Sequence, residues 1–147
     1  MASGSDPGVD QSVTLNRGEP SKLQPSSLHL HLIVSMYYRV TEAEGERGPW
    51  KVSTAGYNYE IHDSGQAEIF SYHWHPRKGH RNYHLHLEAG SRVIELLHGR
   101  ALPTQRVSLE EVLRFLIVEL KVRPLRRDWE RTLEASQSRY EKYRTWS

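Results

Sequence analysis

Four consecutive segments of the sequence have the pattern of strands: three alternate between apolar and polar side chains, and the segment at 50–61 is rich in β-branched and aromatic residues. The four segments cover residues 28–40, 50–61, 66–76 and 81–90. Side chains of a strand point in turn to the two faces of a sheet, so these patterns predict four strands, each with one apolar and one polar face. Short turns, among them Gly48-Pro49 and HDSG at 62–65, connect the strands. Such a chain is expected to form an antiparallel meander with one face against a core.

The pattern changes to a helical period in the last third of the chain. Residues 108–120 open with Ser108 and Glu111 at capping-box spacing and carry apolar side chains at steps of three and four, which predicts a helix that ends before Pro124. Residues 125–143 predict a second helix. Its apolar stripe is Leu125, Trp129, Leu133 and Tyr140. The expected fold is α+β: an antiparallel sheet of four or more strands whose apolar face is covered by two C-terminal helices.

The chain of 147 residues has enough material for one core of moderate size. We therefore expect a single α+β domain over residues 28–147. Residues 1–27 mix Gly, Ser, Pro and Asp with few large apolar side chains, which predicts a disordered N-terminal arm. No segment approaches the roughly 18 apolar residues of a membrane span, and the N-terminus lacks the pattern of a secretory signal. These features predict a cytoplasmic protein with no membrane association.

Five of the nine histidines lie in residues 70–88, and four of them form two His-x-His pairs. Residues i and i+2 share a face of a strand, so His73 lies beside His75 and His84 beside His86. A short connection makes the two strands hairpin partners, which brings the four imidazoles together on one face. The opposite face is expected in the core. Its predicted residues are Phe70, Tyr72, Trp74, Tyr83, Leu85 and Leu87.

Three interpretations of the four histidines remain open. In the first, two or three imidazoles with Glu88 or water bind a divalent metal such as zinc; the chain has no cysteine, so thiolate ligands are excluded. In the second, two histidines act without a metal as acid and base on a phosphodiester, and Arg77, Lys78 and Arg81 bind its phosphate. In the third, the histidines are polar residues on a solvated sheet face. His29 and His31 join the cluster if their strand lies beside the hairpin.

Other features favour structural roles. The loop at 98–111 carries Arg100 and Arg106 before the first helix, and the run at 123–131 contains four arginines with interspersed acids, as in a solvated surface with local ion pairs. The net charge of +2 means that nucleic-acid binding needs a local basic patch. The sequence contains none of the common phosphate-loop, dinucleotide or serine-hydrolase motifs.

A longer series of residues resembles a family of small bacterial proteins. The series is WKVSTAGYNYEIHDSG, YHWHP, HLHLE and LPTQRVSLEEVLRFLIVELKVRPLRRDWERTLE, and the resemblance covers about residues 30–135. Members of that family usually have Pro-His-x-His at the second pair, where this chain has Tyr83, and Gly where this chain has Gln105.

A small sheet with a late His-x-His pair, followed by a helix, also resembles the TumE-type toxins of bacterial toxin-antitoxin pairs. That resemblance carries over to His84 and His86 alone. It implies an RNA-directed toxin, an endoribonuclease in the cytoplasm, with a cognate antitoxin protein as its partner.

Overall fold

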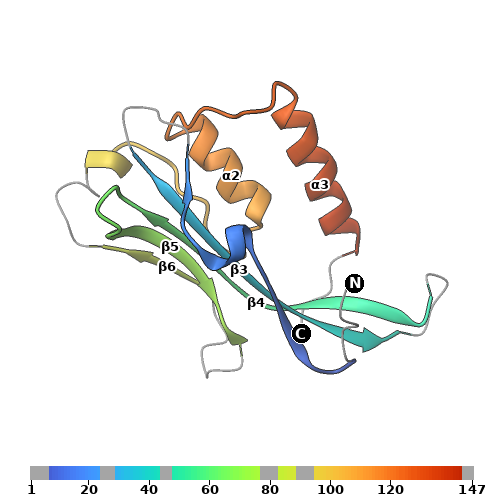
Figure 1. The fold of residues 1–147 in the computed structure, drawn as a ribbon. Coiled ribbons are helices and arrows are strands. Elements are labelled where there is room, and N and C mark those ends of the chain that lie inside the picture. Colours follow the sequence, from blue (N-terminus) through green and yellow to red (C-terminus); the bar gives the residue numbers. More distant parts are fainter. Residues whose placement is uncertain (1–6, 24–28, 44–47, 77–82, 89–94, 144–147) are drawn as a thin grey trace.

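The strands form one antiparallel sheet in the order β1-β3-β4-β5-β6, and β2 pairs with the same strand β3 as β1 does (Figure 1). The computed structural model describes residues 7–23, 29–43, 48–76, 83–88 and 95–143. Its strands are β1 (Asp10–Thr14), β2 (Ser21–Lys22), β3 (His31–Glu42), β4 (Trp50–His62), β5 (Glu68–Trp74) and β6 (His84–Leu87). Its helices are the 3-10 helix η1 (Leu15–Gly18), α2 (Leu109–Val118) and α3 (Trp129–Tyr143).

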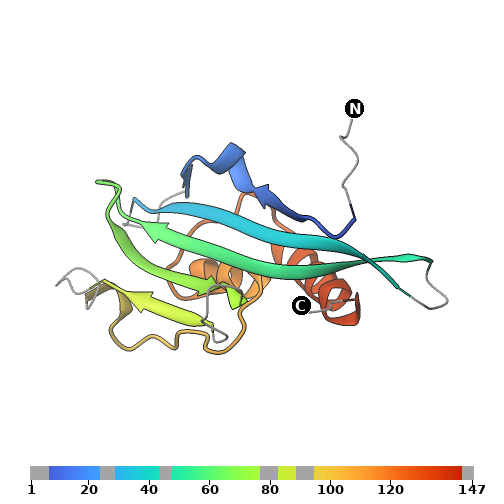
Figure 2. The same cartoon turned by 90° about the horizontal axis from the view of Figure 1, so that it is seen from below.

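Both C-terminal helices lie on the same side of the sheet (Figure 1). Seen from below, the opposite face of the sheet lies in front of them (Figure 2). The α+β fold with two C-terminal helices is therefore confirmed, and the capping box is present because Ser108 and Glu111 each accept the other's backbone N–H.

The core lies between the sheet and α2. Trp74, Phe70 and Tyr72 are buried as predicted, and Leu85 packs against them half-buried. Two buried phenols hold the loop that precedes α2: Tyr57 Oη accepts the Val107 N–H at 3.1 Å, and Tyr72 Oη donates to the Pro103 carbonyl at 3.0 Å. Burial raises the pKa of both phenols, so both stay protonated at neutral pH. These two hydrogen bonds hold the loop before α2 against the inner face of β4 and β5.

Two predicted core residues of the histidine hairpin are exposed instead. Tyr83 is 40% exposed and Leu87 is 51% exposed. They lie just before and at the end of β6, which has a strand neighbour on one side only within the described structure. Fewer side chains therefore cover an apolar residue there than in β5.

The structure also differs from the prediction over part of the N-terminal arm. Residues 10–14 form β1, which pairs with β3 from Asp10↔Arg39 to Thr14↔Ser35, and Ser21 and Lys22 extend the pairing. These residues bury little apolar surface. They are held instead by backbone hydrogen bonds to β3 and by the ion pair of Asp10 with Arg39, at 2.7 Å. Residues 1–6 and 24–28 lie outside the described residues.

The second helix begins four residues later than predicted, at Trp129. Leu125, assigned to its apolar stripe, is 86% exposed in the preceding loop. Pro124 restricts the backbone before Leu125, and Asp128 accepts the N–H of Thr132 at 3.0 Å as the first turn forms. Leu133 is buried as expected.

Irregular pairing at two points changes which side chains share a face. The register between β3 and β4 shifts between Tyr37 and Tyr38, next to Gly56, as is common where a glycine lies inside a strand. A Cβ on Gly56 would lie 2.7 Å from the Trp74 carbonyl oxygen, so this close approach requires glycine. The register between β4 and β5 shifts at Ile61/His62 and leaves Ile69 as the extra residue.

Gln105 has a φ of 76°, in the left-handed region that favours glycine. This conformation destabilises the folded state by about 1–2 kcal/mol for a residue with a Cβ. Glycine avoids that strain, but its greater freedom in the unfolded chain lowers stability by about 0.5–1 kcal/mol. Gln105→Gly is therefore expected to raise the free energy of unfolding by about 0.5–1 kcal/mol, measured by urea denaturation. The neighbouring Thr104→Gly, at a position without positive φ, is expected to lower it. Equal losses in both variants would contradict the account.

Candidate functional site

Polar side chains of three adjacent strands gather on the sheet face opposite the core. The outward positions of β4 are paired with those of β5, and those of β5 with β6, in one antiparallel ladder. We call this surface the histidine face. It consists of Asn58, Glu60, His62, Glu68, Ser71, His73, His75, His84 and His86.

The structure brings together the four histidines predicted from the sequence. His73 is paired with His84, and His86 is paired with Ser71 on the next outward rung. The ring centroids of His73 and His86 are 4.9 Å apart, and those of His73 and His75 and of His84 and His86 are 5.9 Å apart. The β5–β6 hairpin therefore places four imidazoles on one face, with His73 beside two others.

Burial and neighbouring charges both act on His73. It is half-buried, and its Nε2 atom is buried with no hydrogen-bond partner in the described structure. Burial is the main cause that lowers the pKa of His73, and the nearby His86 and His75 lower it further, while Glu68 and Glu60 oppose the shift. His73 is therefore a neutral base at neutral pH, with an unused nitrogen.

A second group on the same face was missed by the sequence analysis. One ligand atom from each of Glu60, His62 and Glu68 lies within 4.8 Å of the other two. His62 Nε2 lies 2.8 Å from Glu60 Oε2. Neither carboxylate belongs to a His-x-His motif, so the spacing of the histidines did not reveal them.

The extra residue Ile69 explains why simple alternation fails here. Without it, Glu68 would share the core face with Phe70 and Tyr72. Because Ile69 and Phe70 are both buried, Glu68 lies on the outer face, where Ser71 Oγ donates to it. The adjacent apolar pair Ile69-Phe70 before an alternating strand is the signal in the sequence that indicates such a bulge.

The described structure adds no further sequence candidate to the four histidines of the β5–β6 hairpin. Arg77, Lys78 and Arg81, the predicted phosphate contacts, lie outside the described residues. Glu88 is exposed beyond β6, and its N–H donates to the Ile69 carbonyl. His31 begins β3, which β4 separates from the hairpin. It is paired with His62 on the outer face, and its Nδ1 lies 3.3 Å from the Asp63 carbonyl. His29 precedes β3.

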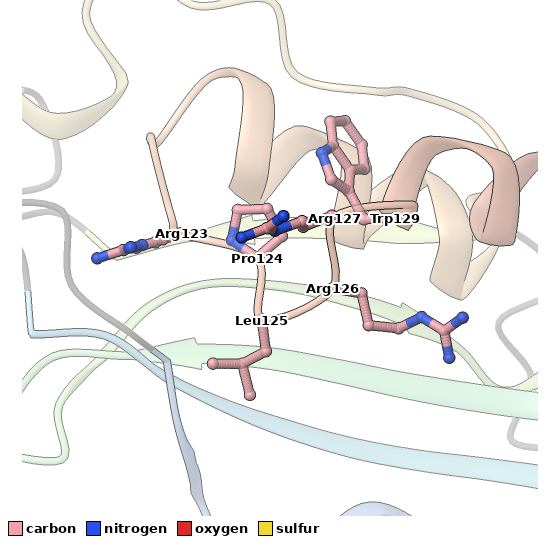
Figure 3. A pocket seen from close by; sticks show the side chains of 6 residues that line it. All are labelled: Arg123, Pro124, Leu125, Arg126, Arg127 and Trp129. Atoms are coloured by element: carbon pink, nitrogen blue, oxygen red, sulfur yellow. The ribbon is translucent and has the colours of Figure 1, made fainter.

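The arginine run before α3 lines a hollow of about 560 Å³ on the helix side (Figure 3). Leu125 and Trp129 point in opposite directions from this loop. Arg126 makes a two-point contact with Asp128, at 3.0 and 2.9 Å, and Arg131 approaches the same carboxylate at 3.5 Å. The hydrogen bond from Arg126 lowers the pKa of Asp128 to about 2. The expected local ion pairs are therefore present.

The arginines of the loop before α2 have structural contacts. Arg100 donates from Nε to the Leu96 carbonyl at 2.8 Å and from Nη1 to the Glu119 carbonyl at the end of α2. The guanidinium of Arg106 lies 4.4 Å from the centre of the buried Trp74 ring, a cation-π contact on the core side. Both residues support the helix layer rather than the histidine face.

Comparison of the chain with protein-family models, with curated proteins and with solved structures finds no match. Among the helices in the described ranges, none combines the length and the apolar character needed to cross a bilayer.

His73 is expected to titrate below its ordinary pKa of 6.5 in an NMR titration of the histidine rings. His86→Asn removes a neighbouring positive charge and should raise that pKa, whereas Glu68→Gln removes a negative charge and should lower it. Because the unfolded chain binds this proton more tightly than the folded one, His73 makes stability fall as pH drops below about 6.5. Titration at or above 6.5 would contradict the burial argument.

Proposed function

We propose that the protein is a small TumE-like ribonuclease toxin whose histidine face acts on RNA in the cytoplasm. The observation that carries the proposal is the His73–His86 pair, with ring centroids 4.9 Å apart on the outer face of the sheet. Acid–base cleavage of RNA needs one neutral and one protonated group within reach of the same phosphate. Two adjacent imidazoles provide this state because one positive charge on the pair costs less than two.

In this mechanism His73 is the base. Its lowered pKa keeps it neutral and able to accept a proton at neutral pH. It removes the proton of the ribose 2′-hydroxyl, and the 2′-oxygen attacks the adjacent phosphorus. His86, which is exposed, donates a proton to the departing 5′-oxygen. The products are a 2′,3′-cyclic phosphate and a free 5′-hydroxyl.

The neighbouring histidines fit the same chemistry. His75 and His84 lie on the flanking outward positions of the hairpin and can donate hydrogen bonds to the phosphate oxygens. Arg77, Lys78 and Arg81 belong to the connection between β5 and β6, and we propose them as additional phosphate contacts. A cognate antitoxin completes the proposal; a neighbouring gene for a small helix-turn-helix protein would support it.

The direct test uses untagged protein and a fluorescent RNA oligonucleotide in EDTA. We expect cleavage to a 2′,3′-cyclic phosphate, and no cleavage where the ribose at the cut site is 2′-deoxy. His73→Ala and His86→Ala should each slow the reaction about 10²- to 10⁴-fold, the usual contribution of an acid–base group. His98→Ala, at an exposed position outside the histidine face, is the matched control and should retain full activity.

Intact RNA in every buffer, or equal rates in wild type and His73→Ala, would overturn the ribonuclease proposal. Cleavage that needs a divalent ion and stops in EDTA would overturn the metal-free mechanism. The alternative function is a non-enzymatic module that binds metal or a protein partner, and the Glu60–His62–Glu68 group favours its metal-binding form.

A further inference from the structure

Glu60, His62 and Glu68 have the donor types and spacing of a metal site. Glu60 and His62 share a face of β4, and Glu68 lies opposite His62 on β5. Their ligand atoms lie within 4.8 Å of one another. Around tetrahedral zinc, bonds of about 2.0–2.1 Å place the ligand atoms about 3.3 Å apart. Small side-chain rotations are therefore enough to close the three groups around an ion.

Each of the three side chains is also oriented by a second contact. Asn58 Nδ2 donates to Glu60 Oε1, and Ser71 Oγ donates to Glu68 Oε1. His62 Nδ1 lies 3.0 Å from the Gln66 carbonyl. Metal-binding histidines and carboxylates usually have such outer partners, which hold the ligand atom toward the ion.

The contacts of His62 favour a cation at its other nitrogen. A carbonyl oxygen only accepts, so Nδ1 must donate its proton to Gln66. A neutral ring then directs the lone pair of Nε2 at Glu60 Oε2, 2.8 Å away. A lone pair and a carboxylate repel each other unless a proton or a metal ion lies between them. The second carboxylate, Glu68, adds to the negative charge of the group.

An independent observation next to the group also indicates a missing polar partner. Asn58 Oδ1 and His73 Nε2 are buried and have no hydrogen-bond partner in the described structure. The two residues are opposite each other in the β4–β5 ladder, on the rung next to that of Glu60 and Ser71. Buried polar atoms are rarely left without a partner. Water molecules on a metal ion donate hydrogen bonds and satisfy an acceptor such as Asn58 Oδ1.

We propose that Glu60, His62 and Glu68 bind one divalent first-row transition-metal ion, with water in its remaining positions. One imidazole with two carboxylates suits Zn²⁺ or Mn²⁺, whereas Mg²⁺ and Ca²⁺ favour sites with oxygen ligands alone. This inference goes beyond the ribonuclease proposal and does not depend on it, because the site is built from residues other than His73 and His86.

The experiment is calorimetric titration of untagged, EDTA-treated and desalted protein with ZnCl₂, and separately with MnCl₂. We expect one ion per chain, with an affinity that falls at least tenfold in His62→Ala and in Glu68→Gln. Glu68→Gln keeps an oxygen that can accept the Ser71 hydrogen bond, so this variant should fold, which circular dichroism checks. Ser71→Ala should lower the affinity by a factor of about 10 to 100, as outer-partner changes do.

His84→Ala is the matched control, since it removes an imidazole from the same face but outside the group. It should leave the zinc affinity unchanged. Zinc binding that survives His62→Ala and is lost in His84→Ala would overturn the proposal and assign the metal to the four histidines. Failure of wild type to bind either ion would overturn it as well. These measurements contain no RNA and the RNA assay contains EDTA, so the two proposals fail separately.

Discussion

The position of β5 between β4 and β6 is the constraint on which the rest of the structure depends. Phe70, Tyr72 and Trp74 point inward and are fully buried or nearly so. Burying each large side chain contributes about 1.5–3 kcal/mol, so a slip of one residue in the register would expose all three at a cost that no surface contact offsets. The same register holds His73 on the outer face, beside His86 and opposite Asn58.

The two proposed sites are electrostatically complementary. An RNA phosphate that approaches His73 and His86 also approaches Glu60 and Glu68, whose negative charges act on His73. Those carboxylates repel an anion. A divalent ion held by Glu60, His62 and Glu68 would neutralise them and leave the histidine pair accessible to phosphate. A metal ion at that group would therefore strengthen RNA binding, although the acid–base step on the histidine pair does not require it.

Much of the fold follows from periodicity in the sequence. The strand patterns between residues 28 and 90 and the capping box at Ser108 were sufficient to predict strands β3 to β6, the first long helix and the outward direction of all four histidines. What alternation could not predict depends on contacts distant in sequence. Strand β1 forms because its backbone can hydrogen-bond to β3. Leu87 is exposed because β6 is at the edge of the sheet, where few side chains cover it.

The site was only half predictable for a related reason. His-x-His motifs are visible in the sequence, whereas Glu68 reaches the outer face through the bulge at Ile69, and Glu60 and His62 come from β4. No local motif connects these three residues. Their proximity is a property of strand pairing, which the sequence indicated only through the adjacent apolar residues Ile69 and Phe70.

The central claim is that the histidine face, and not the arginine loop on the helix side, binds RNA. The most direct measurement is an NMR titration of histidine and tryptophan ring signals with an RNA oligonucleotide made uncleavable by 2′-O-methyl groups. The account predicts that the ring signals of His73 and His86 shift in a saturable way, while the indole signal of Trp129 stays in place. A shift of Trp129 with unchanged histidine rings would contradict it.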